Sequence, residues 1–209
     1  RCVEYARRFN LPIHVRSSFS PLEGTWVVEN HPEGGTMEQA IIAGVAHDKS
    51  EAKVTIVGVP DRTGVAARIF QALADNDLNI DMIVQNVSAA ATGLTDISFT
   101  LPKADGAEAT TVLKKIQGEV GFASLQYDDS IGKLSLVGAG MRSHPGVTAT
   151  FFAAMAEAGV NIEMISTSEI RISVIVREGD LERAARAAHT AFGLDSDQNE
   201  AVVYGGTGR

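Results

Sequence analysis

The sequence contains a single cysteine, Cys2, and no apolar run near the roughly 20 residues that span a bilayer. One cysteine cannot form an internal disulfide, which favours a reducing compartment, and we therefore expect a cytoplasmic protein. Basic residues are also scarce, at 18 against 26 acidic ones, which gives a net charge of −8. Because such a surface repels phosphate groups, we expect no nucleic-acid partner, and the missing apolar run argues against a membrane partner.

The motifs of nucleotide-binding and metal sites are missing as well. There is no GxxxxGK[ST] phosphate loop, and the GAG at 138–140 lacks the third glycine of a dinucleotide-binding loop. The five histidines are scattered along the chain without metal-ligand spacing. We therefore predict no metal site and no cofactor in this chain, and the residues by themselves identify no catalytic residue.

Two segments of the chain repeat one another. Residues 64–83 and 146–165 are identical at ten of twenty aligned positions, where chance predicts about one or two. Upstream of them, VTIVG at 54–58 matches LSLVG at 134–138. The match extends too far for an accidental similarity between two βα units, so we interpret it as a duplicated domain.

Each copy has the pattern of a βαββαβ unit, with period-2 apolar positions in the strands and apolar residues three or four apart in the helices. In the first copy we expect strands at 53–59, 80–88, 94–101 and 122–127, and helices at 64–76 and 105–117. In the second copy we expect strands at 133–139, 162–168, 170–176 and 201–204, and helices at 145–158 and 180–191. This order predicts an α+β fold class with two ferredoxin-like domains, each an antiparallel sheet with both helices on one face.

Two stretches lie outside the repeat. Residues 1–36 combine an amphipathic helix, a short strand and a loop rich in Ser, Pro and Gly, and we interpret them as the tail of another domain followed by a linker. Residues 39–47 predict an extra strand that must pair with one of the two sheets. We assign residues 37–130, including this strand, to the first domain and residues 131–209 to the second.

Two predicted strands, VTIVGV and RISVIV, are apolar on both faces, which predicts cover on both faces of the sheets. Sheet edges invite further pairing. We therefore expect the domains to pair edge to edge and across chains, with a C2 homodimer as the commonest closed arrangement.

The loop before each first helix is the most informative element. It reads PDRTG at 60–64 and MRSHPG at 141–146. A glycine allows close approach of a ligand, and the first N–H groups of the following helix form a carboxylate site. The alternative is that Asp61 and Thr63, or Ser143 in the second copy, simply cap the helix.

The second element is NID at 79–81 and NIE at 161–163, where the next strand begins. An acidic side chain there accepts hydrogen bonds from an α-ammonium group, unless it is only solvated. We expect this strand to lie beside the first strand, so that its start approaches the glycine loop. Carboxylate donors and ammonium acceptors together suit a free amino acid.

Longer segments of the sequence resemble the paired ACT domains of aspartokinases, the enzymes that phosphorylate the side chain of L-aspartate. LPIHVRSSFSPLEGT at 11–25 is similar to the end of the family's catalytic amino-acid kinase domain. The two regulatory repeats are matched by VTIVGVPDRTGVAARIF, NIDMIVQNVS, LSLVGAGMRSHPGVTATFF and NIEMISTSEIRISVIV. The family's Lys-Phe-Gly-Gly-Thr-Ser motif is absent, so the catalytic domain, which would use ATP and Mg, is missing here. Some members make this half as a separate regulatory subunit, and Met37 would then be its start.

The resemblance implies that end-product amino acids, L-threonine and L-lysine, bind between ACT domains and inhibit aspartokinase by feedback. The first site would contain Asp61, Thr63, Gly64, Val65, Ala66, Asn79, Ile80, Asp81 and Gln85. The second would contain Met141, His144, Val147, Thr148, Ala149, Ile162, Glu163, Ser168 and Glu169.

Charge divides the two effectors between the sites. The amide of Gln85 suits threonine at the first site, and the paired carboxylates of Glu163 and Glu169 suit lysine at the second. The expected partners are therefore these amino acids, an aspartokinase catalytic subunit or domain, and a second copy of the chain. Two alternatives stay open: a fragment of a single-chain aspartokinase that has lost its catalytic domain, and a purely oligomerising ACT pair.

Overall fold

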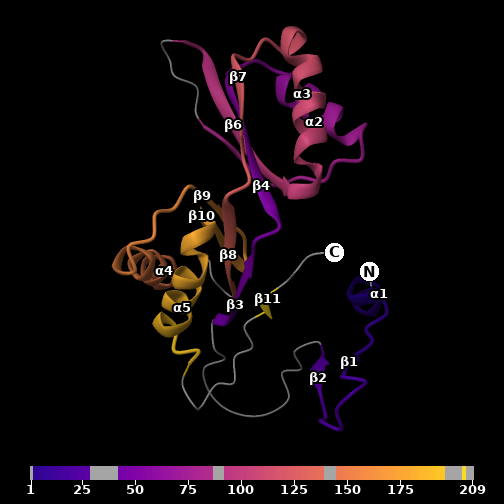
Figure 1. Ribbon diagram of the computed structural model, residues 1–209, viewed down its shortest axis with the longest axis vertical. Helices are drawn as coiled ribbons and strands as arrows, with labels where there is room; N and C mark the ends of the chain where they lie inside the picture. The colour runs from indigo at the N-terminus through magenta and orange to yellow at the C-terminus, as the bar shows by residue number, and fades with distance from the viewer. Residues whose placement is uncertain (1, 29–41, 87–91, 139–144, 196–203, 206–209) are drawn as a thin grey trace. The chain divides into compact units, whose positions relative to one another are not determined.

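The computed structural model describes residues 2–28, 42–86, 92–138, 145–195 and 204–205 (Figure 1). The chain divides into two compact units, Arg1–Gln39 and Ala40–Arg209.

The N-terminal unit contains helix α1 (Cys2–Arg8) and two short antiparallel strands, β1 (Ile13–Val15) and β2 (Thr25–Val27). The predicted helix and first strand are present, whereas β2 was not predicted because it follows directly on the segment rich in Ser, Pro and Gly that was interpreted as a loop. The His14 ring stacks on Trp26 with 3.9 Å between ring centroids. None of the described residues of this unit is buried, so within them it has no core of its own.

The first repeat folds in the predicted order. Its elements are β4 (Glu51–Pro60), α2 (Val65–Ala74), β5 (Asp81–Gln85), β6 (Leu94–Pro102), α3 (Gly106–Val120) and β7 (Ser124–Asp128). The four strands form one sheet in the order β5-β6-β4-β7, and all neighbouring strands are antiparallel. This is the ferredoxin-like arrangement that the sequence predicts.

The sheet of the second repeat includes a strand that precedes the first repeat in the sequence. Its own elements are β8 (Ile131–Gly138), α4 (Pro145–Glu157), β9 (Met164–Thr167), β10 (Arg171–Arg177) and α5 (Leu181–Ala191). The sheet order is β11-β3-β8-β10-β9, where β3 (Ile42–Asp48) is antiparallel to β8 and β11 (Tyr204–Gly205) is parallel to β3. In the second sheet β3 therefore holds the place that β7 holds in the first.

This topology corrects two predictions. The extra strand belongs to the second sheet and not to the first domain. Of the closing strand expected at 201–204, the described Tyr204 pairs with β3 and not with β8. The physical reason is that β3 occupies the edge of β8 over Ile42 to Asp48, so that Tyr204 and Gly205 pair with the outer edge of β3. One strand of the second sheet therefore precedes the whole first repeat in the sequence.

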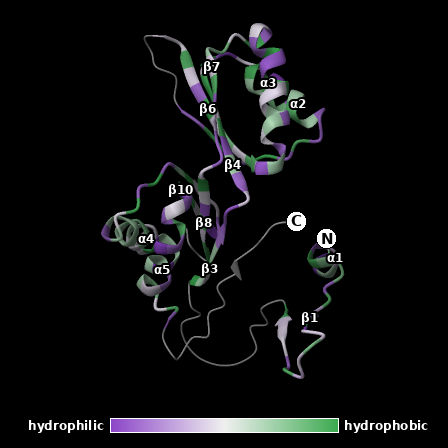
Figure 2. Ribbon diagram, viewed as in Figure 1, coloured by the Kyte–Doolittle hydropathy of each residue, from purple (hydrophilic) through white to green (hydrophobic). Residues whose placement is uncertain are grey.

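The helices of each repeat pack together on one face of its sheet (Figure 1). In α2, Val65, Ile69, Ala72 and Leu73 recur three and four residues apart and are all buried against the sheet. Figure 2 shows hydrophilic and hydrophobic residues together on α3, as a helix with one solvent-facing side requires.

The opposite faces of the sheets differ in how far they are covered. In β10 every residue from Ile172 to Val176 is buried, so the prediction of cover on both faces is confirmed for RISVIV. In β4 the residues that alternate with the core ones, such as Thr55 and Val57, are only half-buried.

Part of that cover comes from the other repeat. Met82, Ile131, Met164 and Ile175 form a separate buried cluster, and β5 contacts β9 while β4 contacts β8. Met82 and Met164 occupy equivalent positions in the two repeats. The two domains therefore pack on each other with approximate twofold symmetry.

Candidate functional site

The glycine loop of the first repeat is open at the start of α2. Gly64 is the N-cap residue with a φ of 91°, a left-handed conformation that glycine adopts without strain. No side chain caps this helix, so the capping alternative for Asp61 and Thr63 is wrong. Instead the Asp61 N–H donates to the Gly93 carbonyl at 2.9 Å, which holds the loop against the start of β6. The helix N-terminus is thus left without a side-chain cap, as an anion site requires.

The other predicted residues of this loop divide between surface and core. Asp61, Thr63 and Gly64 are exposed, Ala66 is half-buried, and Val65 is buried in the core of the repeat. A β carbon added to Gly64 would meet no atom within 4 Å. The described residues therefore leave the space in front of the loop open.

The NID element lies at the wrong end of the sheet to join this loop. Strand β6 separates β5 from β4, so the two strands are not neighbours as expected. Asp81 pairs in register with Thr100, which pairs with Lys53 at the start of β4. The glycine loop follows Pro60, at the other end of β4 and about 20 Å away at the rise of a strand. The expectation that one repeat brings both elements together is wrong.

The remaining residues of the first site follow the same division. Asn79 is exposed, and Ile80 is half-buried against the core of the repeat. Gln85 ends β5 and is exposed. Gln85 pairs in register with Ile97, which pairs with Ile56, so its amide stands nearer to the loop end of the sheet than Asp81 does.

In the second repeat, Met141 and His144 lie outside the described residues. Val147 is buried in the core, Thr148 is half-buried and Ala149 is exposed, all in the first turns of α4. Ser168 and Glu169 are exposed in the turn between β9 and β10, where the Ser168 N–H donates to the Arg171 carbonyl at 2.7 Å.

The start of β9 repeats the arrangement of β5. Ile162 packs against the core of its repeat, and the Glu163 N–H donates to the Ile175 carbonyl at 2.8 Å. Since Ile175 pairs with Lys133, Glu163 stands level with the start of β8. It therefore lies at the sheet end opposite to the loop that follows β8.

Both carboxylates predicted to accept an α-ammonium group already hold a lysine of the other repeat. Asp81 Oδ2 lies 3.2 Å from Lys133 Nζ, and Glu163 Oε2 pairs with Lys53 Nζ. Lys53 and Lys133 are equivalent residues, each directly before the matching VTIVG and LSLVG strands. The two pairs are thus reciprocal. Lys53 near the start of β4 pairs with Glu163 just before β9, and Lys133 near the start of β8 pairs with Asp81 at the start of β5.

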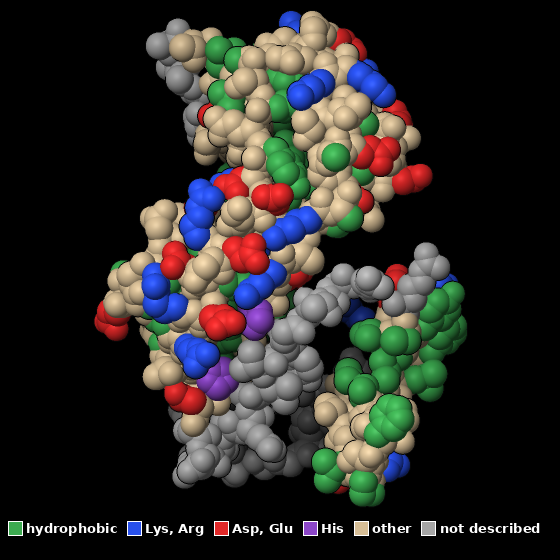
Figure 3. Space-filling view, viewed as in Figure 1, with side chains coloured by type: hydrophobic (Ala, Val, Ile, Leu, Met, Phe, Trp, Pro, Cys, Tyr) green, Lys and Arg blue, Asp and Glu red, His purple; other side chains and the backbone are tan. Residues whose placement is uncertain are grey.

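Further ion pairs lie between the repeats. Together these pairs form what we call the ion-pair belt, which consists of Glu51, Lys53, Asp81, Lys103, Asp128, Lys133, Glu163, Arg177 and Glu178. Lys133 also pairs with Glu51, whose side chain is 12% exposed. Arg177 contacts both Glu163 and Asp128 at 2.6 Å. Figure 3 shows basic and acidic side chains gathered over the junction of the two repeats.

A further ion pair, Lys103–Glu178 at 3.2 Å, joins two residues that each open the short 3-10 turn before the second helix of their repeat. The sequence analysis missed all of these cations. The only signal was that Lys53 and Lys133 precede the repeated strand at the same position.

The ion pairs shift the pKa values of Asp81, Lys133 and Asp128. Burial opposes ionisation of Asp81, but hydrogen bonds from the Met82 N–H and from Lys133 outweigh it and lower its pKa. Burial likewise opposes the charge of Lys133, yet Glu51 and Asp81 raise its pKa. The pKa of Asp128 is lowered in the same way, against burial, by the Ser130 N–H and Arg177. These groups are therefore charged together over the neutral range.

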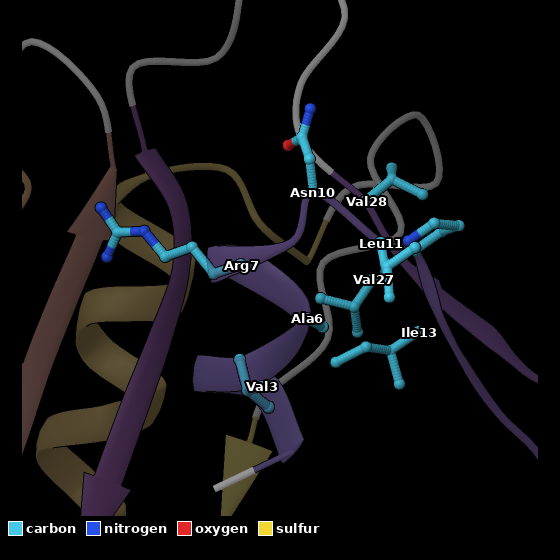
Figure 4. A pocket seen from close by; sticks show the side chains of 9 residues that line it. Val3, Ala6, Arg7, Asn10, Leu11, Ile13, Val27 and Val28 are labelled. Atoms are coloured by element: carbon cyan, nitrogen blue, oxygen red, sulfur yellow. The ribbon is translucent and has the colours of Figure 1, made fainter.

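Two cavities lie elsewhere. One, of about 610 Å³, lies in the N-terminal unit, where Figure 4 shows the apolar side chains of Leu11, Ile13 and Val27 beside α1. The other, of about 480 Å³, lies between β3 and α5, with His47 and His189 in its wall. Neither of these two cavities contains a predicted effector residue.

Two searches of the described residues were negative. No group of three or more His, Cys, Asp or Glu side chains in this part of the chain is placed to hold a metal ion. None of the described helices is long and apolar enough to cross a membrane.

The chain matches known proteins along its whole length. Residues 54–117 and 134–192 match the ACT domain family. The aspartokinase of Mycolicibacterium smegmatis is 59% identical over 209 residues, all of this chain and 49% of that protein. The chain thus spans about half the length of the curated relatives it matches.

Solved structures agree with this assignment. The regulatory subunit of aspartate kinase from Thermus flavus is 41% identical with a TM-score of 0.69, and the match covers 73% of this chain and 99% of that subunit. A structure of aspartokinase alpha and beta subunits contains a chain that is 46% identical, with a TM-score of 0.68 and the same coverage. The chain therefore belongs to the ACT domain family, as an aspartokinase regulatory region with two ACT domains.

Proposed function

We propose that this chain senses an end-product amino acid, L-threonine foremost, and relays its binding to an aspartokinase catalytic domain as feedback inhibition. The observation that carries the proposal is the uncapped start of α2 behind the left-handed Gly64, in front of which the chain leaves open space. Backbone N–H groups there suit the α-carboxylate of a free amino acid.

The site needs a second copy of the chain. One amino acid is too small to reach from the Gly64 loop to Asp81, which stand at opposite ends of their sheet. Glu163 is no nearer, because it pairs with Lys53 at the start of the same strand. The acceptor of the α-ammonium group thus comes from a neighbouring copy, which a C2 homodimer supplies twice.

The side-chain chemistry favours threonine over lysine. Gln85 offers an exposed amide at the end of β5, which suits a hydroxyl group. Glu163 was expected to help bind lysine, but its two oxygens are held by Lys53 and Arg177. Lysine recognition at the second site then depends on Glu169 alone. An aspartokinase III from E. coli that shares the fold at 19% identity (TM-score 0.66) was solved with lysine and aspartate, and this likeness concerns the fold alone.

The N-terminal unit is the proposed connection to catalysis. Tyr5, Phe9, Leu11, Phe19 and Trp26 are all more than half exposed, and nothing among its described residues is buried. A unit of this size without a core is not stable by itself. We assign it to the end of the amino-acid kinase domain, where ATP and Mg would serve the phosphorylation of L-aspartate.

Isothermal calorimetry of the chain against all the protein amino acids tests the proposal. We expect threonine to bind, and its binding to raise the free energy of unfolding by RT ln(1 + [L]/Kd), about 2.7 kcal/mol at a hundredfold excess over Kd. A chain that dimerises but binds no amino acid would instead be a purely oligomerising module.

A further inference from the structure

The two carboxylates between the repeats differ in how firmly they are held. Glu163 is 11% exposed, and each of its oxygens has its own cation, Lys53 and Arg177. Asp81 is 47% exposed and is held at 3.2 Å by Lys133 through one oxygen. Its other oxygen accepts the N–H of the next residue, Met82, at 2.8 Å, and no cation among the described residues pairs with that oxygen. Asp81 is therefore the carboxylate that can be released.

The backbone supports the same distinction. The pairing of β5 with β6 shifts register between Asp81 and Val84, and Met82 has a φ of 45°, a left-handed value that is uncommon for a residue with a side chain. Bulges of this kind re-aim side chains near functional sites. Strand β9, which carries the equivalent Met164, pairs with β10 in unbroken register.

Lys133 keeps one ion-pair partner when its ion pair with Asp81 is broken. Its second partner is Glu51, and the two side chains are 13% and 12% exposed. When Asp81 leaves, this buried ammonium group keeps its counter-ion. Asp81 is nearly half exposed, so water can solvate its carboxylate group when it leaves Lys133.

From this asymmetry, and on the basis of the proposed function, we infer that the Lys133 ammonium group competes with the α-ammonium group of the effector for Asp81. Lys133 is thus a positioning residue that sets effector affinity without touching the effector. Lys133 lies on β8 of the second repeat, so effector binding to Asp81 of the first repeat breaks an ion pair that joins the two repeats. Glu163, held by two cations, stays in place and does not bind an effector ammonium group.

Such an exchange links effector binding to the junction of the ACT domains. An effector can shift a conformational equilibrium only through different affinities for the two states. Here Asp81 pairs with Lys133 in one state and with the ammonium group of the effector in the other. Regulation would follow from the looser junction between the repeats.

The test removes the competitor without leaving a buried charge alone. In the double variant Glu51→Gln/Lys133→Met, the buried Glu51–Lys133 pair is removed as a whole, and only the half-exposed Asp81 loses its cation. We expect calorimetry with L-threonine to show affinity at least threefold tighter than for the parent chain. Lys133→Arg, which restores the charge beside Asp81 and Glu51, is expected to stay within twofold of the parent.

Lys103→Met is the matched control. It removes another lysine that joins the repeats, 3.2 Å from Glu178, but it does not touch Asp81. We expect its affinity for threonine to equal that of the parent. A purely structural role of the belt predicts weaker binding in both variants, so tighter binding in the first alone identifies competition.

Two outcomes overturn the inference. Threonine affinity equal to or below that of the parent in the double variant would show that Lys133 does not compete for Asp81. If that variant fails to fold, Asp81→Asn decides: we expect threonine to bind at least tenfold more weakly, and unchanged binding overturns the inference. A parent chain that binds no amino acid would overturn the proposed function itself, so the two failures are distinguishable.

Discussion

Substitutions at Gly64 separate the two reasons why a glycine stands before α2. Its φ of 91° makes any other residue strained, and a left-handed conformation costs most L-residues about 1–2 kcal/mol. A β carbon there meets no atom within 4 Å, so the fold itself has room for a side chain. Gly64→Asn keeps the left-handed conformation at little cost, because asparagine tolerates it, while placing bulk in front of the helix N-terminus.

We expect Gly64→Asn to lower the free energy of unfolding by no more than about 1 kcal/mol while weakening threonine binding at least tenfold, or about 1.4 kcal/mol. Urea denaturation followed by circular dichroism gives the first quantity and calorimetry the second. Gly146→Ala is the matched control, because Gly146 has open space around it in the first turn of α4 and no left-handed φ. This control should be neutral or stabilising, by about 0.4–1 kcal/mol. Parent-like threonine affinity in Gly64→Asn would refute the assignment of this loop.

Three further predictions concern the junction and the second site. Ile131→Ala empties a fully buried position between the repeats, and urea denaturation should show a loss of about 2–5 kcal/mol; a loss below 1 kcal/mol would mean that the repeats do not pack there. The lowered pKa values of Asp81 and Asp128 stabilise the fold above about pH 4, and this contribution disappears as the pH falls through them. The contribution of Lys133, whose pKa is raised, is instead lost as the pH rises through its pKa in the folded protein. Denaturation at pH 7 and pH 3 should therefore show an acid loss that shrinks in the double variant Asp81→Asn/Asp128→Asn, and an equal loss in both proteins would contradict it. Glu169→Gln should weaken any lysine binding about tenfold and leave threonine binding unchanged, and equal weakening of both in calorimetry would reject the charge assignment.

The sequence predicted the parts of the fold that depend on local pattern. The duplication, the order of helices and strands in each repeat and the helical faces were all readable, because apolar spacing within a segment reflects its secondary structure. The strand partners were readable only in part. The position of β6 between β5 and β4 belongs to the ferredoxin-like order that was predicted, and the expectation that β5 lies beside β4 did not follow from that order. That β3 completes the second sheet was not readable, because it depends on edges brought together from distant parts of the chain.

The candidate site shows the same limit at the level of side chains. The sequence identified Asp81 and Glu163 as carboxylates at equivalent positions, and in the structure each of them pairs with a lysine. It did not identify Lys53 and Lys133 as the groups that hold them, because these residues lie 110 and 52 positions away along the chain. The difference between Asp81 and Glu163 arises from Arg177, which contacts only the second of them.

The most direct test of the account is complementation between two inactive chains. Gly64→Asn removes the carboxylate side of the proposed site, and Asp81→Asn removes the ammonium side. Each variant alone should bind threonine at least tenfold more weakly than the parent, so neither contributes a site of parent affinity. When the two are refolded together in equal amounts, half of the dimers carry both variants, and one of the two sites in each mixed dimer is intact, so about a quarter of all sites should recover parent affinity. A mixture that shows no sites of parent affinity in calorimetry, although sedimentation shows mixed dimers, would contradict a site shared between two copies of the chain.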